Sequence, residues 1–253
     1  MDDESVKNFS ELQLSYEKFR DLARNKSLSR FEKIGFPNSY RERYEQYIFE
    51  DICSKVTNLD EKNKSVLDIG PGCSDLPKKI IEICRQNHHN LVFCDSEEML
   101  EFHKEEPFLH KASGMFPKNI NDIKNIEQKY DVIICYSVFH YIFVDTNVWD
   151  FIDQSLSLLN TGGQFLIGDI PNNSKRKRFF SSESGVKYHQ DFTNSKEIPE
   201  VNFNTIEYNK IDDAVINSII LRAQSSGFDA YLIPQNQKLP MSNRRDDILI
   251  TRP

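Results

Sequence analysis

The sequence predicts an α/β fold in which a doubly wound, mostly parallel sheet follows an N-terminal helical annex. Short apolar runs of β type alternate with helical periods from residue 65 to residue 170, which is typical of parallel strands joined by right-handed crossovers. The strands are apolar at almost every position, which indicates that helices cover both faces of the sheet. We expect the annex to span residues 1–60 and the sheet domain to span residues 61–253.

The annex is expected to contain two helices. Between Ser10 and Phe31 apolar residues recur at a rough helical period. The stretch GFPNSYRERYEQYIFEDICSKV then places Ser39 and Glu42 at the spacing of a capping box, which predicts a second helix that runs to about Leu59. Its tyrosine-bearing face is compatible with a core, a lid or a dimer contact, so the sequence leaves the oligomeric state open.

The sheet domain is expected to contain seven strands. Strands are predicted at residues 65–69, 90–95, 108–113, 131–137 and 164–170, with helical segments around 75–86, 97–104, 119–128 and 147–159. A helix at 212–228 leads to AYLIP (230–234) and DDILITR (246–252). We expect these last two strands to close the sheet as an antiparallel pair at its edge.

Composition argues against several classes of protein. The 253 residues carry a formal charge of −7 and have a pI near 5.5, so the overall field attracts neither nucleic acid nor an anionic membrane. No apolar stretch reaches the roughly 20 residues that span a bilayer, and the start MDDESVKNFS does not resemble a signal peptide. We therefore expect a cytoplasmic protein without nucleic-acid or membrane partners. The five cysteines are interpreted as reduced core thiols, and no metal-ligand spacing is present.

The stretch VLDIGPGCSDLP (66–77) joins the first strand of the sheet domain to its first helix, where ligands of such sheets bind. Gly70 and Gly72 permit a sharp turn and a close approach of a ligand to the backbone. The G-x-G-x-x-G spacing of a dinucleotide site is absent, and the Asp68 carboxylate would repel a pyrophosphate. This carboxylate suits an amino-acid ammonium instead, unless it merely caps the following turn.

The second strand ends in Asp95, 23 residues after Gly72. This is about where a Rossmann-like unit places the carboxylate that binds two ribose hydroxyls. Asp68 and Asp95 together predict a nucleoside that carries an amino-acid tail. Taken alone, Asp95 has the alternative of an N-cap for the helix at EEMLEF.

In this order, VLDIGPG, VFCDSEEML, KASGMF and YDVIICYSVFHYI resemble the motifs of class I S-adenosylmethionine-dependent methyltransferases, over roughly residues 60–251. Ser74 departs from the pattern, because many members carry a third glycine there. The resemblance implies a Rossmann-like methyltransferase sheet, S-adenosyl-L-methionine as the cofactor and S-adenosyl-L-homocysteine as its product. The residues that it implies for cofactor binding are Asp68, Gly70, Gly72, Asp95, Ser96, Gly114, Met115 and Ser137. For the last three, an ordinary turn is the alternative.

Such a site transfers a methyl group by in-line displacement, so the protein mainly aligns the acceptor and excludes water. A hydroxyl acceptor profits from a general base, whereas an anionic oxygen does not. His140 and Tyr141 follow the fourth strand on the acceptor side of the sheet, and His140 is the first candidate for a base or a hydrogen-bonding group. His189 is a further catalytic candidate. A packed histidine without a catalytic role is the alternative for both.

Basic residues point to a small anionic acceptor. The segment after the fifth strand contains SKRKR, which is compatible with a phosphate clamp or with a solvated loop. The residues expected to bind the acceptor are Tyr40, Arg41, Arg178 and Tyr188. Arg244 and Arg245 flank the expected mouth of the site, and an anionic acceptor follows if these cations converge.

Three segments outside the cofactor motifs support a narrower resemblance. IGFPNSYRERYEQYIFEDI, PNNSKRKRFFSSESGVKYHQ and LPMSNRRDDILITRP are similar to segments of methyltransferases of bacterial surface-polysaccharide biosynthesis, including capsular phosphoramidate O-methyltransferases. This implies a phosphoramidate or nucleotide-activated acceptor under a lid of N-terminal helices. Two other classes stay open: an NAD-dependent oxidoreductase, which the missing glycine disfavours, and a catalytically silent scaffold that binds the cofactor.

Overall fold

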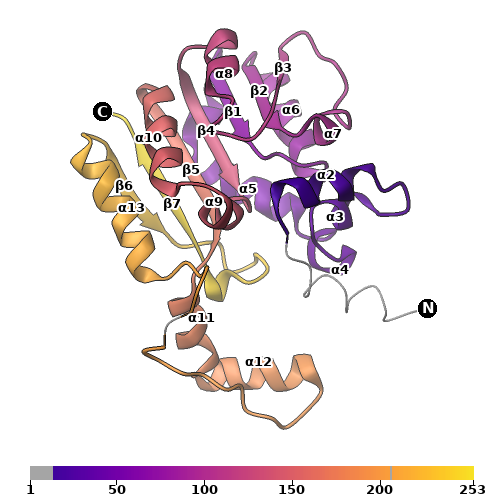
Figure 1. Cartoon of the computed structure of the whole chain (residues 1–253), viewed down its shortest axis with the longest axis vertical. Coiled ribbons are helices and arrows are strands. Elements are labelled where there is room, and N and C mark those ends of the chain that lie inside the picture. Colours follow the sequence, from indigo (N-terminus) through magenta and orange to yellow (C-terminus); the bar gives the residue numbers. More distant parts are fainter. Residues whose placement is uncertain (1–13, 206) are drawn as a thin grey trace.

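A seven-stranded sheet forms the centre of the computed structural model, which describes residues 14–205 and 207–253 (Figure 1). The strands are β1 (Ser65–Ile69), β2 (Asn90–Asp95), β3 (Leu109–Ser113), β4 (Tyr130–Tyr136), β5 (Leu159–Pro171), β6 (Asp229–Ile233) and β7 (Arg245–Thr251). Their order is β3-β2-β1-β4-β5-β7-β6. Strands β1 to β5 pair in parallel, and β7 is antiparallel to both β5 and β6. The expected doubly wound sheet with an antiparallel pair at its edge is confirmed.

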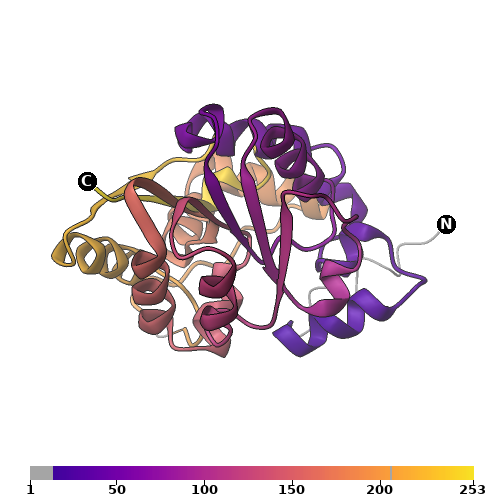
Figure 2. The ribbon, with the colours of Figure 1, turned by 90° about the horizontal axis from the view of Figure 1, so that it is seen from above.

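Helices cover both faces of the sheet (Figure 2). One face carries α8 (Ile120–Ile126), α9 (Phe139–Asp145), α10 (Val148–Leu158) and α13 (Asp213–Ser225). The other face carries α5 (Glu45–Lys55), the short 3-10 helix η1 (Thr57–Asp60), α6 (Leu76–Gln86) and α7 (Glu97–Leu100). Alternate strand residues serve the two layers: Leu67 packs with Phe139, and its neighbour Val66 packs with Ile80. This two-sided burial explains why the strands are apolar at nearly every position.

The cysteines contribute to these layers as free thiols. Cys84 and Cys94 are fully buried on opposite faces of the sheet, and burial raises the pKa of the Cys94 thiol to about 12. None of the described helices is long and apolar enough to cross a membrane.

The N-terminal helices are shorter than predicted. In place of one helix to Phe31 and a second to about Leu59, the chain forms short helices that break at Asn25 and again before α5. They are α2 (Tyr16–Arg24), α3 (Arg30–Lys33) and α4 (Asn38–Arg41). The Asn25 side chain accepts a hydrogen bond from the N–H of Ser27 at 3.0 Å, which favours a turn over a helix. Residues 10–13 of the predicted first helix lie outside the described residues.

The expected capping box of Ser39 and Glu42 is not formed, because Ser39 lies inside α4. A capping box does form one helix earlier, where Ser29 caps α3 and Glu32 reaches back to the Ser29 N–H at 2.7 Å. Buried Lys33 then donates to the carbonyl of Ala23 at 3.0 Å, so that it satisfies an unpaired carbonyl at the end of α2. These contacts fold the N-terminal segment back over the carboxyl ends of the strands.

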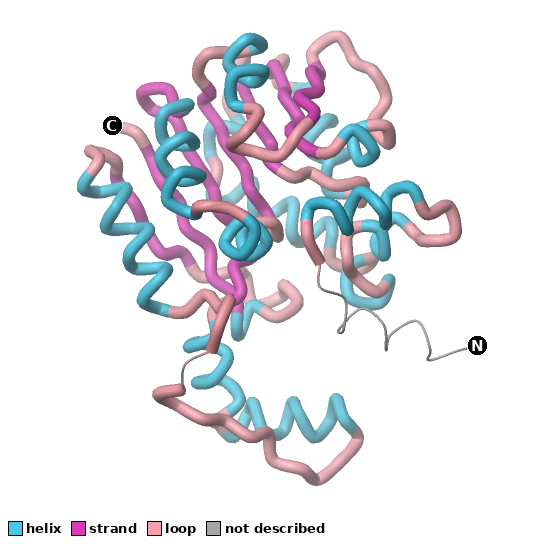
Figure 3. Tube along the Cα trace, viewed as in Figure 1, coloured by secondary structure: helices cyan, strands magenta, loops and turns pink. Residues whose placement is uncertain are grey.

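The basic segment after β5 is helical, which corrects the interpretation of SKRKR as a solvated loop. Asn172 and Ser182 act as N-caps of α11 (Asn173–Phe180) and α12 (Glu183–Thr193). Both helices project beyond the sheet (Figure 3). A short 3-10 helix, η2 (Ser242–Arg244), packs against α11 and precedes β7.

Candidate active site

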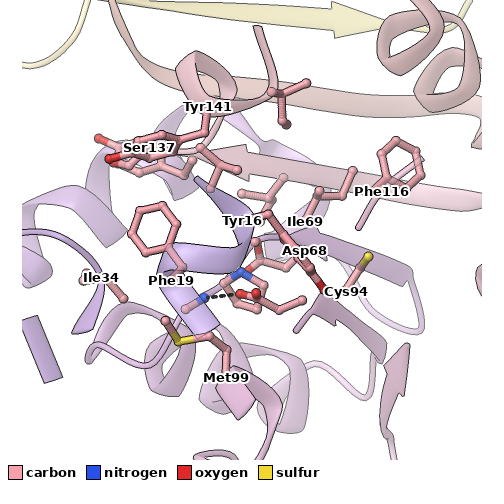
Figure 4. A pocket seen from close by; sticks show the side chains of 18 of the residues that line it. Tyr16, Phe19, Ile34, Asp68, Ile69, Cys94, Met99, Phe116, Ser137 and Tyr141 are labelled. Atoms are coloured by element: carbon pink, nitrogen blue, oxygen red, sulfur yellow. Dashed lines mark hydrogen bonds between the residues drawn. The ribbon is translucent and has the colours of Figure 1, made fainter. Parts of the chain in front are cut away.

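A cavity with an empty volume of about 1100 Å³, which includes its open mouth, lies at the carboxyl ends of β1, β2 and β4 (Figure 4). From β1 the chain adds β2 and β3 on one side, and it then adds β4 and β5 on the other side, so the strand order reverses between β1 and β4. Ligands of doubly wound folds bind at this point. We call it the glycine-loop cavity, because the turn at Gly70–Gly72 forms one of its walls. Nine of the site residues predicted from the sequence line it: Arg41, Asp68, Gly70, Gly72, Asp95, Gly114, Met115, Ser137 and Tyr141.

The turn after β1 requires glycine at two positions. Gly70 has φ +73° and Gly72 has φ +64°, in the left-handed region that favours glycine. A Cβ on Gly70 would lie 2.7 Å from a methyl group of Val138, and one on Gly72 would lie 2.7 Å from a methyl group of Ile34. The turn therefore packs directly against the loop after β4 and against the N-terminal segment, and it exposes backbone to the cavity.

Asp95 presents a buried carboxylate at the end of β2. It accepts hydrogen bonds from the N–H groups of Gly72 at 3.0 Å and Ser96 at 2.7 Å. Burial raises its pKa to about 6, against the lowering effect of these two donors. The cap of α7 is Ser96, whose hydroxyl accepts from the N–H of Met99 at 3.3 Å. The alternative interpretation of Asp95 as an N-cap is thus wrong, and Ser96 holds the helix without lining the cavity.

Asp68 is 5% exposed and lines the same cavity. Burial, together with the negative charge of Asp95, raises its pKa to about 8. None of the hydrogen bonds among the described residues involves its carboxylate, so it does not cap the following turn. A buried carboxylate without a donor favours a cationic or hydrogen-bond-donating ligand group.

A chain of buried polar contacts joins the N-terminal segment to the loops after β1 and β4 and to the end of β5. The Arg41 guanidinium donates to Glu45 at 2.6 Å and to the Ser137 hydroxyl at 3.1 Å. Ser137 donates to Asp169 at 2.6 Å, and Ser74 donates to Glu45 at 3.1 Å. Ser137 has φ +61°, which indicates backbone strain held by these contacts. Ser74 thus occupies the position of the missing third glycine and fixes the loop through its side chain.

The N-terminal helices contribute aromatic residues that sequence reasoning did not assign to the site. Tyr16 and Phe19 lie one turn apart on α2, and both line the cavity, as do Ile34 and Phe36. Burial and the nearby Asp95 carboxylate raise the pKa of the Tyr16 phenol to about 12. The Phe19 ring meets the Tyr141 ring edge-on at 4.8 Å (Figure 4). The helical period revealed this face but could not distinguish core from cavity.

A second cavity lies on the other side of α9, and we call it the cationic cavity. Its lining includes Arg176, Lys210, Arg244 and Arg245, together with His140. Tyr141 and Asp145 line both cavities, so α9 forms their common wall.

His140 is neutral in this environment. Burial, and after it the charge of Arg245, lowers the pKa of its imidazole to about 3. Its Nδ1 atom is buried and has no hydrogen-bond partner among the described residues. An imidazole with so low a pKa is a weak general base near neutral pH.

Four predicted residues lie elsewhere. Tyr40 lines a third, smaller cavity beside Arg41 and Tyr136. Arg178, Tyr188 and His189 line neither the glycine-loop nor the cationic cavity. The physical reason is that α11 and α12 replace the expected loop: Arg178 pairs with Asp213, and the rings of Tyr188 and His189 pack against Phe180. Within the described residues, no group of three or more His, Cys, Asp or Glu side chains could hold a metal ion.

Comparison with known proteins identifies solved structures with a similar fold. No protein-family model matches the chain. No curated protein matches it. The plantazolicin methyltransferase BpumL in complex with S-adenosyl-L-homocysteine is 16% identical over 98% of this chain and 99% of that chain, with a TM-score of 0.57. An O-methyltransferase family protein from Burkholderia thailandensis is 14% identical over 95% of this chain and 64% of that chain, with a TM-score of 0.56.

The CurJ carbon methyltransferase is 14% identical over 98% of this chain and 69% of that chain, with a TM-score of 0.51. These likenesses establish the fold: the chain has the Rossmann-like fold of class I S-adenosylmethionine-dependent methyltransferases. The three proteins act on different kinds of acceptor, as a plantazolicin methyltransferase and a carbon methyltransferase illustrate. The fold alone therefore does not identify an acceptor.

Proposed function

We propose that this chain is an S-adenosyl-L-methionine-dependent methyltransferase. The observation that carries the proposal is the buried Asp95 carboxylate, which two backbone N–H groups hold in the glycine-loop cavity at the end of β2. A carboxylate in this position suits the two hydroxyls of a ribose. Support also comes from the shared fold, because BpumL was crystallised with the product S-adenosyl-L-homocysteine.

The remaining cavity residues fit the rest of that cofactor. Asp68, whose carboxylate has no hydrogen-bond partner among the described residues, suits the ammonium of the amino-acid tail, and the Gly70–Gly72 turn allows close approach of the backbone. Gly114 and Met115 would lie along the adenine, and Ser137 beneath the methionine portion. A dinucleotide fits less well, because Asp68 would repel a pyrophosphate.

The bound cofactor supplies an electrophilic methyl group, and this chain's residues orient the reactants and exclude water. The N-terminal segment, residues 1–60, acts in this proposal as a lid. Tyr16, Phe19 and Phe36 support this role, since they cover the cavity from helices or turns outside the sheet. Tyr141 stands in the wall between the cofactor and the acceptor.

We infer that the methyl group goes to an oxygen of a small anionic acceptor. An anionic oxygen needs no general base, which agrees with the neutral state and low pKa of His140. His140 then acts as a neutral hydrogen-bonding group. The resemblance of three segments to surface-polysaccharide enzymes supports a precursor of a bacterial capsule or surface polysaccharide, such as a phosphoramidate, as the acceptor.

The test is a calorimetric titration with S-adenosyl-L-homocysteine, with NAD as the comparison ligand. We expect micromolar binding of the former and no binding of NAD. The Asp95→Ala variant should weaken binding by about a hundredfold, because it removes two charge-assisted hydrogen bonds. Asp229→Ala is the matched control, since Asp229 is an exposed residue of β6. Binding of NAD alone, or an equal loss in both variants, would overturn the proposal.

A further inference from the structure

The cationic cavity gathers positive charge in an acidic protein. Four cations line it: Arg176 of α11, Lys210 of the segment before α13, Arg244 at the end of η2 and Arg245 at the start of β7. Two carboxylates line it as well, and one of them, Glu207, is paired with Lys177 at 2.5 Å. Since the whole chain has a net charge of −7, this convergence is local and does not follow from composition.

Three of these cations are available for a ligand. Among the described residues, no carboxylate lies within 4.0 Å of a charged nitrogen of Arg176, Lys210 or Arg244. Aromatic rings support the two arginines: Arg244 lies 5.6 Å from the Phe180 ring centre and 5.4 Å from that of Tyr188, and Arg176 lies 5.1 Å from that of Phe180. Arg244 also donates one N–H to the Asn243 side-chain oxygen at 3.1 Å. A ring engages the face of a guanidinium, so the other N–H groups remain available for an oxyanion.

The fourth cation connects the two cavities. Arg245 donates to the backbone carbonyl of Asp169 at 3.1 Å, and the Asp169 carboxylate accepts from Ser137 at 2.6 Å. Ser137 lines the glycine-loop cavity and contacts Arg41. A ligand in the cationic cavity would thus lie next to the segment after β4 that lines the glycine-loop cavity, across the wall made by Tyr141.

We propose that the cationic cavity binds a phosphate-type oxyanion through Arg176, Lys210 and Arg244. Three cations from separate segments suit a tetrahedral dianion, whose several oxygens accept hydrogen bonds from different directions, better than the two coplanar oxygens of a carboxylate. His140 adds a neutral ring with an unpartnered Nδ1 to the wall. If the proposed methyltransferase function holds, on which this step rests, the oxyanion belongs to the methyl acceptor.

The test is a calorimetric titration of the full chain with inorganic phosphate and with methyl phosphate at low ionic strength, with acetate as the comparison. Arg176→Gln and Lys210→Gln should each weaken phosphate binding by about tenfold or more, because each removes a charged donor. Arg43→Gln and Lys104→Gln are the matched controls, since both side chains are exposed. We expect the controls to bind phosphate as the unchanged protein does.

Titration of the same variants with S-adenosyl-L-homocysteine separates this inference from the proposed function. Loss of phosphate binding with unchanged binding of the thioether supports both. Binding of the thioether without phosphate binding, acetate binding as tight as phosphate binding, or an equal loss in the control variants overturns the oxyanion site alone. Phosphate binding without thioether binding supports the oxyanion site and refutes the proposed function, and with it the role of the oxyanion as acceptor.

Discussion

The two cavities that meet at α9 differ in charge. The glycine-loop cavity is lined by the buried carboxylates of Asp68 and Asp95, whereas the cationic cavity is lined by Arg176, Lys210, Arg244 and Arg245. Opposite charges in adjacent cavities suit a pair of ligands of opposite charge. Methyl transfer from a sulfonium to an oxyanion is a reaction of such a pair, and the charges of both reactants are dispersed as it proceeds.

Burial has the same effect on titratable groups in both cavities: it favours the neutral form. It raises the pKa of Asp68 to about 8 and that of Asp95 to about 6, and it lowers the pKa of His140 to about 3. A ligand of the right charge reverses this effect at the carboxylates, because it stabilises their ionised form.

The largest expected effect is a loss of stability when the buried ion pair of Arg41 and Glu45 is broken. Arg41→Leu leaves the Glu45 carboxylate buried without its partner, and we expect it to reduce the free energy of unfolding by about 3–5 kcal/mol. Urea denaturation measures this loss. The exposed neighbour Arg43→Leu is the control. If Arg41→Leu with Glu45→Leu is no more stable than Arg41→Leu alone, the unpaired charge is not the cause.

The next effect concerns the affinity for S-adenosyl-L-homocysteine as a function of pH. A ribose requires the ionised Asp95 carboxylate as acceptor, so below its pKa of about 6 binding must displace one proton. We expect the dissociation constant to rise about tenfold per pH unit below about pH 8, where pairing with the ammonium requires ionised Asp68, and about a hundredfold per unit below about pH 6, where Asp95 must lose its proton as well. Calorimetry over the range checks both slopes. If Asp95→Asn keeps the steeper slope below pH 6, that slope belongs to another group.

A smaller effect is expected on the stability of the free protein. The pKa of Asp68 is raised from 3.8 to about 8 in the folded state, so the folded chain retains a proton that the unfolded chain has lost between these values. Stability therefore falls as pH rises through this window. Asp68→Asn removes the ionisable group, and we expect it to stabilise the protein by about 1 kcal/mol or more at high pH, and less near pH 5. Thermal unfolding at both pH values measures the difference, and a gain that does not grow with pH contradicts the assignment.

The smallest effect is expected at His140. With a pKa of about 3, its imidazole stays neutral over the physiological range. Phosphate binding to His140→Gln should therefore show the same pH dependence above about pH 5 as the unchanged protein. Its affinity should change by less than about tenfold. An inflection near pH 6.5 that disappears in the variant would show that the imidazole titrates there.

The sheet and the glycine-loop cavity could be predicted because their signals are local. β1 and β2 have the predicted limits, since each is a short apolar run with a polar boundary. Asp68 and Asp95 lie at the carboxyl ends of their strands, and Gly70 and Gly72 follow the first of these strands. Parallel strands bring their carboxyl ends to one edge of the sheet. Both the residues and their meeting point thus follow from periodicity and spacing.

The cationic cavity could not be predicted in this way. Arg176, Lys210 and Arg244 are far apart in sequence, and they converge only because α11 and η2 pack together beside α9. The polar sequence of α11 gave no apolar period, so its helix depends on the Asn172 cap, and with it the positions of Arg176 and Arg178. Tyr16 was missed for another reason: an aromatic residue on a helix face is equally compatible with core packing.

The most direct test of the central claim is a crystal structure of the protein with S-adenosyl-L-homocysteine. We expect the ribose hydroxyls within hydrogen-bonding distance of Asp95, the ammonium next to Asp68, and the sulfur directed at the wall formed by Tyr141, with the cationic cavity beyond it. A ligand that lies outside the glycine-loop cavity, or whose sulfur points away from Tyr141, would contradict the assignment of the two cavities to cofactor and acceptor.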